Sequence, residues 1–288
     1  MAEGRIIQSL SGYYDVDSGG EIHRCRGRGN FRKRKITPLV GDFVEFEEGY
    51  ILDVLPRKNE MLRPPLANLD QGVLVCSAVE PEFHPLLLDR FLVRLEAEGI
   101  HTAICFSKMD IIDDGQYARL EQFALDYREI GYEVILTSAD DKEGLNALRD
   151  LLDGKVSVFA GQSGVGKSSL LNRLDPDLQL KTGTISESLG RGKHTTRRVK
   201  LMPLDSGFVA DTPGFSSIDF RGIETEDLSF YFPEMRERAG ECKFRGCTHI
   251  AEPKCAVKRA LEEGEIPEYR YEHYKQFFEE IQGQKRRY

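Results

Sequence analysis

The sequence has no long hydrophobic run, because no uninterrupted apolar stretch approaches the roughly 18 residues that a membrane-spanning helix needs. Met1 to Ile7 also lack the apolar core of a secretory signal, since Glu3 and Arg5 interrupt them. These two absences argue against a membrane protein and an exported protein. We therefore expect a cytoplasmic protein that has no membrane partner. We also expect a monomer.

Cysteine is present but does not form a disulfide framework. Among the six cysteines, Cys76 and Cys105 lie in apolar, strand-like runs, whereas Cys242, Cys247 and Cys255 cluster around a histidine. Free or metal-binding thiols of this kind are typical of a reducing compartment. The cysteines therefore agree with a cytoplasmic location.

Acidic residues are missing from one basic segment, although the whole chain has a net charge of -8. Between residues 22 and 41 there are seven Lys or Arg and no acid, and these bases flank Phe31. They are Arg24, Arg26, Arg28, Arg32, Lys33, Arg34 and Lys35. Bases can follow a phosphate backbone while a ring stacks on a base, so we expect an RNA-binding surface here. A solvated basic loop is the alternative. The C-terminal Lys285-Arg286-Arg287 adds either a minor contact or a frayed tail.

Three units follow one another along the chain. Residues 1–66 contain five short alternating runs separated by glycine-rich turns, which predicts a small β-barrel. The expected strands cover residues 5–7, 13–16, 22–25, 43–46 and 50–54. Arg63-Pro64-Pro65 is expected to end the barrel as an extended linker, because proline cannot donate a ladder hydrogen bond.

Residues 67–223 alternate apolar strands with amphipathic helices, which predicts a doubly wound, parallel α/β sheet. Strands are expected at residues 73–79, 102–106, 133–137, 156–160 and 208–210, with helices near 86–98 and 117–127 and from 167 onward. Residues 224–288 are polar, cysteine-bearing and helical, which predicts a mainly α unit. We find no internal repeats.

A complete phosphate-binding loop, or Walker A motif, lies directly between one of these strands and a helix. The expected nucleotide contacts are Gly161, Gln162, Ser163, Gly164, Val165, Gly166, Lys167, Ser168 and Ser169. Backbone N–H groups would wrap the phosphates, Lys167 would reach the β and γ oxygens, and Ser168 would bind Mg²⁺. Asp211, at the end of a later strand, would hold the same ion, and the Gly214 N–H would contact the γ-phosphate.

Two further strand ends carry residues that would recognise the base. Ser107-Lys108-Met109-Asp110 and Thr137-Ser138-Ala139 resemble the guanine-specificity motifs of GTPases. The Asp110 carboxylate would accept hydrogen bonds from guanine, and the Lys108 stem would pack on the ring. Ser107 stands where Asn is usual and is too short to make all of its contacts. This substitution leaves a P-loop ATPase or kinase open as an alternative.

The guanine motifs precede the Walker A motif, the reverse of the usual order, which indicates a circular permutation. With Arg63 to Asn68, Gly192 to Thr196 and the cysteine cluster, this order resembles the ribosome small subunit-dependent GTPases. The resemblance covers nearly the whole chain. It implies an N-terminal oligonucleotide-binding (OB) barrel, a permuted GTPase unit and a zinc-binding unit. It also implies GTP hydrolysis that helps late maturation of the small ribosomal subunit through contact with its rRNA.

The segment Gly190 to Arg198 lies where the first switch loop of a GTPase belongs. Thr195 or Thr196 would bind Mg²⁺ and the γ-phosphate. Many GTPases have a water-orienting Gln after the Asp-x-x-Gly motif, but Phe215 stands there and cannot bind water. His194 is the nearest substitute, and the resemblance favours it; a solvated loop histidine is the alternative. A GTP-gated RNA-binding module with negligible hydrolysis also remains open.

The spacing Cys242-x4-Cys247-x-His249-x5-Cys255 supplies three thiolates and one imidazole. Four such ligands complete a tetrahedral site with no open position, which predicts one structural Zn²⁺. Buried cysteines without a metal are the alternative.

Overall fold

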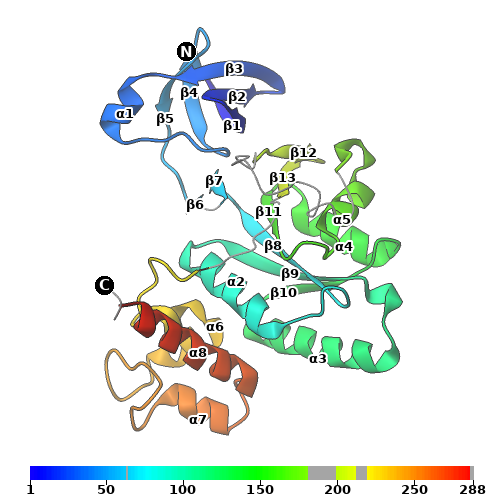
Figure 1. Cartoon of the computed structure of the whole chain (residues 1–288), viewed down its shortest axis with the longest axis vertical. Coiled ribbons are helices and arrows are strands. Elements are labelled where there is room, and N and C mark those ends of the chain that lie inside the picture. The colour runs from blue at the N-terminus through cyan, green and yellow to red at the C-terminus, as the bar shows by residue number, and fades with distance from the viewer. Residues whose placement is uncertain (63, 181–198, 212–218, 286–288) are drawn as a thin grey trace, which may run out of the picture.

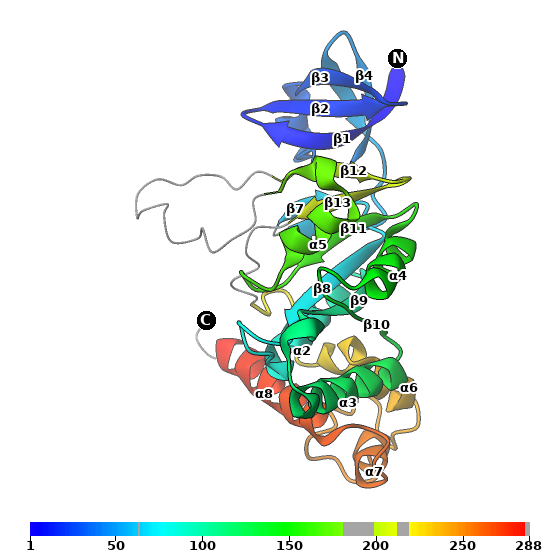
Figure 2. The same cartoon turned by 90° about the vertical axis from the view of Figure 1, so that its right-hand side faces the viewer.

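The computed structural model describes residues 1–62, 64–180, 199–211 and 219–285. The barrel lies at one end of the long axis, the α/β sheet in the middle and the C-terminal helices at the other end, as Figure 1 and Figure 2 show. None of the described helices is long and apolar enough to cross a membrane.

The N-terminal unit is a closed barrel with the strand order β1-β2-β3-β5-β4. The strands are β1 (Ala2–Leu10), β2 (Tyr13–Ser18), β3 (Glu21–Gly27), β4 (Phe43–Glu47) and β5 (Tyr50–Val54), and the short helix α1 (Asn30–Arg34) follows β3. Each strand places one fully buried side chain in the barrel core: Ile6, Val16, Cys25, Val44 and Ile51. The predicted five-stranded barrel is confirmed.

The proline-containing segment is a hairpin and not an extended linker. It consists of β6 (Glu60–Leu62) and β7 (Pro65–Ala67), which pair antiparallel. Pro65 begins β7, and a proline is tolerated at the first residue of a strand because its missing donor is not needed there. The Ala67 N–H donates to the Val40 carbonyl at 2.9 Å, which fastens the hairpin to the barrel.

The central unit is a six-stranded sheet with the order β10-β9-β8-β11-β13-β12. The strands are β8 (Gln71–Ser77), β9 (His101–Ser107), β10 (Glu133–Leu136), β11 (Val156–Ala160), β12 (Met202–Leu204) and β13 (Gly207–Asp211). All pairs are parallel except β12 with β13. The sequence did not predict β12, a three-residue edge strand whose Pro203 breaks the usual strand pattern.

Helices cover both faces of this sheet. They are α2 (Pro85–Ala97), α3 (Asp114–Ile130), α4 (Lys142–Leu152) and α5 (Lys167–Leu174), with the 3₁₀ turns η1 (Met109–Ile111) and η2 (Pro176–Leu178). On β8, Leu74 joins the core under α2 and α3, whereas its neighbours Val73 and Val75 join the core under α4 and α5. This alternation buries both faces and confirms the doubly wound fold.

The C-terminal unit is helical, as predicted, and it packs against α2. Its elements are η3 (Leu228–Tyr231), α6 (Pro233–Ala239), α7 (Ala256–Glu262) and α8 (Glu268–Lys285). Val93 of α2 belongs to the same apolar core as Phe232, Tyr274 and Phe277. The interface between the central and C-terminal units is therefore hydrophobic at its centre.

A buried ionic network reinforces this contact. The fully buried Arg270 of α8 donates to Asp89 of α2, and its Nε donates to Glu234 Oε1 of α6 at 2.7 Å. Tyr127 Oη donates to Asp89 Oδ1 at 2.6 Å, and His273 Nδ1 lies 2.5 Å from Asp89 Oδ2. Three elements, α2, α3 and α8, thus meet at the Asp89 carboxylate, and Arg270 connects it to α6.

Candidate functional site

The phosphate loop follows β11 and ends at the first residue of α5. Glycines at the two ends of the loop determine its shape. Gly161 has a φ of +138°, and a Cβ there would lie 2.2 Å from the Val75 carbonyl oxygen. Gly166 caps α5 with a φ of +96°. These two glycines let the loop turn tightly at the N-terminus of α5, whose N–H groups would bind phosphates.

Lys167 is the first residue of α5 and lies folded over the phosphate loop. Its Nζ donates to the carbonyl oxygens of Gly161 and Gln162, at 2.9 and 2.8 Å. Burial lowers the pKa of Lys167, and nearby Asp211 partly opposes this shift. The ammonium therefore lies in a poorly solvated place, where an added phosphate would interact with it strongly.

Ser168 and Asp211 bring α5 and β13 together at the mouth of this loop. Ser168 Oγ donates to Asp211 Oδ2 at 2.9 Å. The other carboxylate oxygen, Oδ1, is buried and has no hydrogen-bond partner among the described residues. A hydroxyl and a carboxylate are oxygen ligands that Mg²⁺ prefers, and a buried oxygen of this kind needs a partner. The residues present therefore fit a magnesium ion.

The two guanine motifs lie side by side at the ends of β9 and β10. The Met109 N–H donates to the Thr137 carbonyl at 3.2 Å, which joins one motif to the other. Asp110 is exposed, whereas Ser138 is buried and Ala139 is half-buried. Lys108 has a φ of +60°, and its Nζ donates to the Glu80 carbonyl at 2.6 Å. The segment that contains Glu80 follows β8, and sequence reasoning did not place it at this site.

Ser107 connects the base motif to the phosphate loop. It is buried, and its Oγ lies 2.5 Å from the Val165 carbonyl oxygen and 3.2 Å from that of Cys76. The sequence alone predicts only that Ser107 is too short to make all the contacts of an asparagine. Its hydroxyl nevertheless reaches the loop, because Gly166 brings that backbone close to β9.

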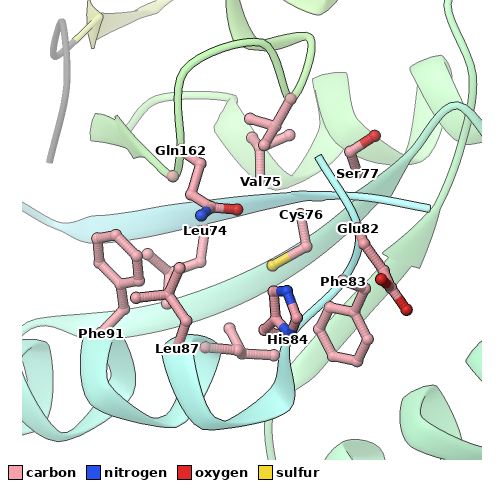
Figure 3. A pocket seen from close by; sticks show the side chains of 13 residues that line it. Leu74, Val75, Cys76, Ser77, Glu82, Phe83, His84, Leu87, Phe91 and Gln162 are labelled. Carbon is pink, nitrogen blue, oxygen red and sulfur yellow. The ribbon is translucent and has the colours of Figure 1, made fainter. Parts of the chain in front are cut away.

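A small apolar pocket lies on the α2 side of the phosphate loop (Figure 3). Its lining includes Cys76 from β8, Phe83 and His84 from the segment before α2, and Leu87 from α2. The Gln162 side chain lies over this pocket in Figure 3. Burial raises the pKa of the Cys76 thiol to about 12, so this cysteine is a neutral lining group.

Several predicted residues lie outside the described parts of the chain. His194, Thr195 and Thr196 belong to residues 181–198, and Gly214 and Phe215 belong to residues 212–218. Their predicted roles therefore stay predictions.

The four predicted zinc ligands meet in the C-terminal unit. The ligand atoms of Cys242, Cys247, His249 and Cys255 all lie within 4.8 Å of one another. His249 Nδ1 is 3.6 Å from Cys242 Sγ and 3.3 Å from Cys255 Sγ. Burial lowers the pKa of His249, which favours the neutral imidazole that metal binding requires. Three sulfurs and one nitrogen at this spacing fit a tetrahedral zinc ion.

The basic segment of the barrel differs from expectation at its aromatic residue. Phe31 is buried in the barrel core, so the prediction that its ring stacks on a base is wrong. The ring packs beside Gly27, which has no side chain to keep it out. Tyr50 is exposed instead, because Ile51 beside it points into the core and neighbouring strand residues face opposite ways. That alternation could have identified Tyr50 from the sequence.

The bases of this segment are not equally available. Arg34 pairs with Asp53 at 3.0 Å, and Arg24 lies 3.9 Å from Asp15. Lys33 and Lys35 are exposed and have no ion-pair partner among the described residues. The side chain of Arg32 lies outside the described parts, as do those of Lys285 to Arg287.

Comparison with known proteins identifies one family. The family model for the RsgA GTPase matches residues 54–221, and that for the RsgA N-terminal domain matches residues 3–51. The chain is 60% identical to the small ribosomal subunit biogenesis GTPase RsgA of Bacillus cytotoxicus and 59% identical to that of Bacillus cereus, each covered in full.

Two solved structures agree along nearly the whole chain. YloQ, described as a circularly permuted GTPase, is 49% identical with a TM-score of 0.84, over 99% of this chain and 96% of that one. YjeQ from Thermotoga maritima is 37% identical with a TM-score of 0.86, over 98% of this chain and 99% of that one. These similarities confirm the permuted order and the family resemblance seen in the sequence.

Proposed function

This chain belongs to the RsgA GTPase family, and on that premise we propose that it hydrolyses GTP while bound to the small ribosomal subunit. It is a GTPase of small ribosomal subunit biogenesis, as its relatives at 59–60% identity are named. The family assignment sets aside the alternative of a P-loop ATPase or kinase. The proposal concerns how the site works and what the chain binds.

The main support for the proposed nucleotide site is the hydrogen bond between the Ser168 hydroxyl and the Asp211 carboxylate. We infer that these residues hold Mg²⁺ together with Thr196, and that the ion offsets negative charge on the phosphates. Lys167 would leave the loop carbonyls and bind the β and γ oxygens, because phosphate offers a charged acceptor in place of neutral ones. Asp110 would recognise guanine at the adjoining strand end.

Hydrolysis requires a positioned water as well as bound nucleotide. Phe215 cannot orient one, so the free chain is expected to turn over slowly. We infer that the small subunit stimulates hydrolysis in late maturation by ordering residues 190–198, with His194 orienting the water. A GTP-gated RNA-binding module would instead show negligible turnover with or without the subunit.

The remaining parts of the chain supply the proposed contacts with rRNA and the proposed structural metal. Lys33, Lys35 and Tyr50 of the barrel offer exposed charge and an exposed ring. The Cys₃His cluster would hold one structural Zn²⁺ and fix the loops of the C-terminal unit. We propose that the protein acts as a cytoplasmic monomer, which sedimentation of the pure protein and cell fractionation would test.

The experiment that tests the site compares two Ser→Ala variants in GTP turnover with saturating small subunits. Ser168→Ala should lower kcat by roughly 100-fold or more, because it removes a metal ligand. Ser206→Ala is the matched control, since Ser206 Oγ also donates to a carboxylate, that of Asp153, at 2.6 Å. Equal turnover in the two variants would contradict the assignment of the site.

A further inference from the structure

A cation from the barrel lies against the central sheet. Arg5 of β1 pairs with Phe43 of the adjacent strand β4, and its guanidinium carbon lies 4.3 Å from the centre of the Phe43 ring. The same carbon lies 5.4 Å from the centre of the Phe208 ring of β13. Ile6, the next residue, is buried in the barrel core, so the alternation of a strand turns Arg5 outward. Arg5 therefore joins a ring of the barrel to a ring of the sheet.

Arg5 is poorly solvated at this contact. Its Nε is buried and has no hydrogen-bond acceptor among the residues that the structure describes. Burial lowers the pKa of Arg5, and the charges of Asp70 and Asp17 oppose this shift. A buried donor without an acceptor destabilises a fold, whereas an apolar side chain could fill the same space without that loss. A contact that served stability alone would therefore not need a cation here.

Backbone contacts hold β1 against the same edge of the sheet. The Leu201 N–H donates to the Ile7 carbonyl at 2.8 Å. Next to this bond, Gln8 and Lys200 form an antiparallel bridge. Residues 200 and 201 lead directly into β12, which pairs with β13, and Figure 2 shows β1 beside β12. A displacement of β1 would therefore reach β13 through the backbone as well as through Arg5.

The strand under Arg5 and its neighbour lead into the predicted nucleotide site. β13 ends at Asp211, three residues after Phe208, and the Asp211 carboxylate accepts from Ser168. At about 3.3 Å a residue, this separation is only about 10 Å along the strand. β11 pairs with β13 and ends at Ala160, immediately before the phosphate loop. The contact at Arg5 is thus one short strand away from the proposed magnesium ligands.

We propose that Arg5 is a positioning residue for GTP hydrolysis, through which binding at the barrel changes the placement of Asp211 and of the phosphate loop. The inference rests on the proposed function, in which the small subunit stimulates hydrolysis and the barrel contacts rRNA. Arg5 acts from the contact between barrel and sheet and not on the nucleotide itself. Packed side chains and rigid strands can carry energetic coupling between distant sites. Stimulation by the subunit therefore depends on Arg5, whereas unstimulated turnover does not.

The test compares GTP turnover of the full chain with and without saturating small subunits. Arg5→Ala should keep the unstimulated kcat within about twofold of the wild type and lower the stimulation by roughly fivefold or more, the lower end of a typical coupling between sites. Arg149→Ala is the matched control, because Arg149 of α4 binds Asp205 in the turn between β12 and β13 from the central unit and not from the barrel. Small subunits should stimulate this control as strongly as the wild type.

A second variant tests whether Arg5 acts through the ring of β13. Phe208→Leu keeps an apolar side chain but removes the ring, so it should also reduce the stimulation, and it keeps the proposal testable if Arg5→Ala does not fold. Combining the two changes should reduce the stimulation no further than Arg5→Ala alone, because both remove the same contact. Additive losses would show that the two residues act separately and would overturn the proposed route.

A binding measurement gives a readout that does not depend on hydrolysis. If the barrel and the nucleotide site are coupled, small subunits bind the chain with different affinities when it carries GDP and when it carries a non-hydrolysable GTP analogue. Arg5→Ala should bring the ratio of these two affinities towards one. A merely structural role for Arg5 would weaken both affinities alike and leave their ratio unchanged, which would contradict the proposal.

Three outcomes of the turnover experiment separate this inference from the proposed function. Equal stimulation of Arg5→Ala and of the wild type would overturn the inference and leave the proposed function standing. A comparable loss of kcat without subunits would also overturn it, because Arg5 would then act on the nucleotide site itself. A wild-type chain that small subunits do not stimulate would reject the proposed function, and this inference with it.

Discussion

Single hydrogen-bonding groups connect the parts of the nucleotide site. Ser107 lies at the end of β9, yet its nearest acceptor is the Val165 carbonyl in the phosphate loop. A hydroxyl has one proton to donate, so the 2.5 Å contact to Val165 excludes a simultaneous donation to Cys76. The predicted base-recognition motif and the phosphate loop are thereby joined through one side chain. The sequence could identify Ser107 as unusual but could not show which backbone it would meet.

Removal of this hydroxyl should loosen the phosphate loop. We expect Ser107→Ala to weaken GTP binding by roughly 3- to 10-fold, the equivalent of one hydrogen bond of about 1 kcal/mol. Ser157→Ala is the control, because Ser157 is a buried serine of β11 that hydrogen-bonds Gln71 and not the loop. Titration with a fluorescent guanine nucleotide measures both. Equal affinity in the two variants would show that the contact with Val165 does not support binding.

At the scale of elements, strands with clear periodicity were predictable and short or proline-bearing ones were not. The apolar runs of β8, β9 and β11 predicted the parallel sheet correctly, because the strands of such a sheet are buried on both faces. The edge strand β12 and the hairpin β6–β7 were missed, since three residues carry too little pattern. The prediction that Phe31 is exposed was wrong. The single helical turn of α1 directs its ring into the core, and the basic residues around it do not show a helical pattern in the sequence.

We propose that a bound metal, more than regular structure, fixes the C-terminal loops. We expect about one zinc per chain, lost in the Cys247→Ser, His249→Ala double variant together with the protease resistance of residues 240–256. Four ligands fix loops that lack strands of their own, so their removal leaves the segment accessible. Cys76→Ala, a cysteine outside the cluster, should keep the metal. Elemental analysis and limited proteolysis measure the two effects, and a metal-replete wild type without zinc would contradict the assignment.

The barrel should contribute the salt-dependent part of RNA binding. We expect Lys33→Ala with Lys35→Ala to weaken binding to small subunits and to flatten its salt dependence, because fewer counterions are released. Arg34→Ala should have the smaller effect on the slope, since Arg34 is already paired with Asp53. Binding measured at several salt concentrations tests this. An unchanged slope in the double variant would place the main RNA surface elsewhere.

At the scale of the whole molecule, contacts between units could not be read from the sequence. Asp89 and Arg270 are 181 residues apart, and nothing in either local pattern indicates that they meet. The barrel is likewise joined to the sheet by a backbone bond, from the Leu201 N–H to the Ile7 carbonyl at 2.8 Å. Leu201 lies three residues after the predicted switch segment that ends at Arg198. The barrel therefore contacts the chain close to the segment that is predicted to form the switch loop.

The buried network should dominate the stability of the C-terminal contact. We expect Arg270→Ala to lower the free energy of unfolding by about 3–5 kcal/mol, because it leaves the carboxylates of Asp89 and Glu234 buried without their cation. Arg259→Ala removes only an exposed pair and should cost at most about 1 kcal/mol. Urea unfolding of both variants measures the two changes in the free energy of unfolding. A similar, small loss in each would mean that the network contributes little.

We propose that this phosphate loop hydrolyses GTP in response to the small ribosomal subunit. The most direct measurement is the GTP turnover of the wild-type chain alone, with saturating small subunits, and with large subunits as the control. We predict that small subunits raise kcat by roughly tenfold or more, which corresponds to lowering the barrier by at least about 1.4 kcal/mol, and that large subunits have no such effect. The same slow turnover under all three conditions would contradict the claim.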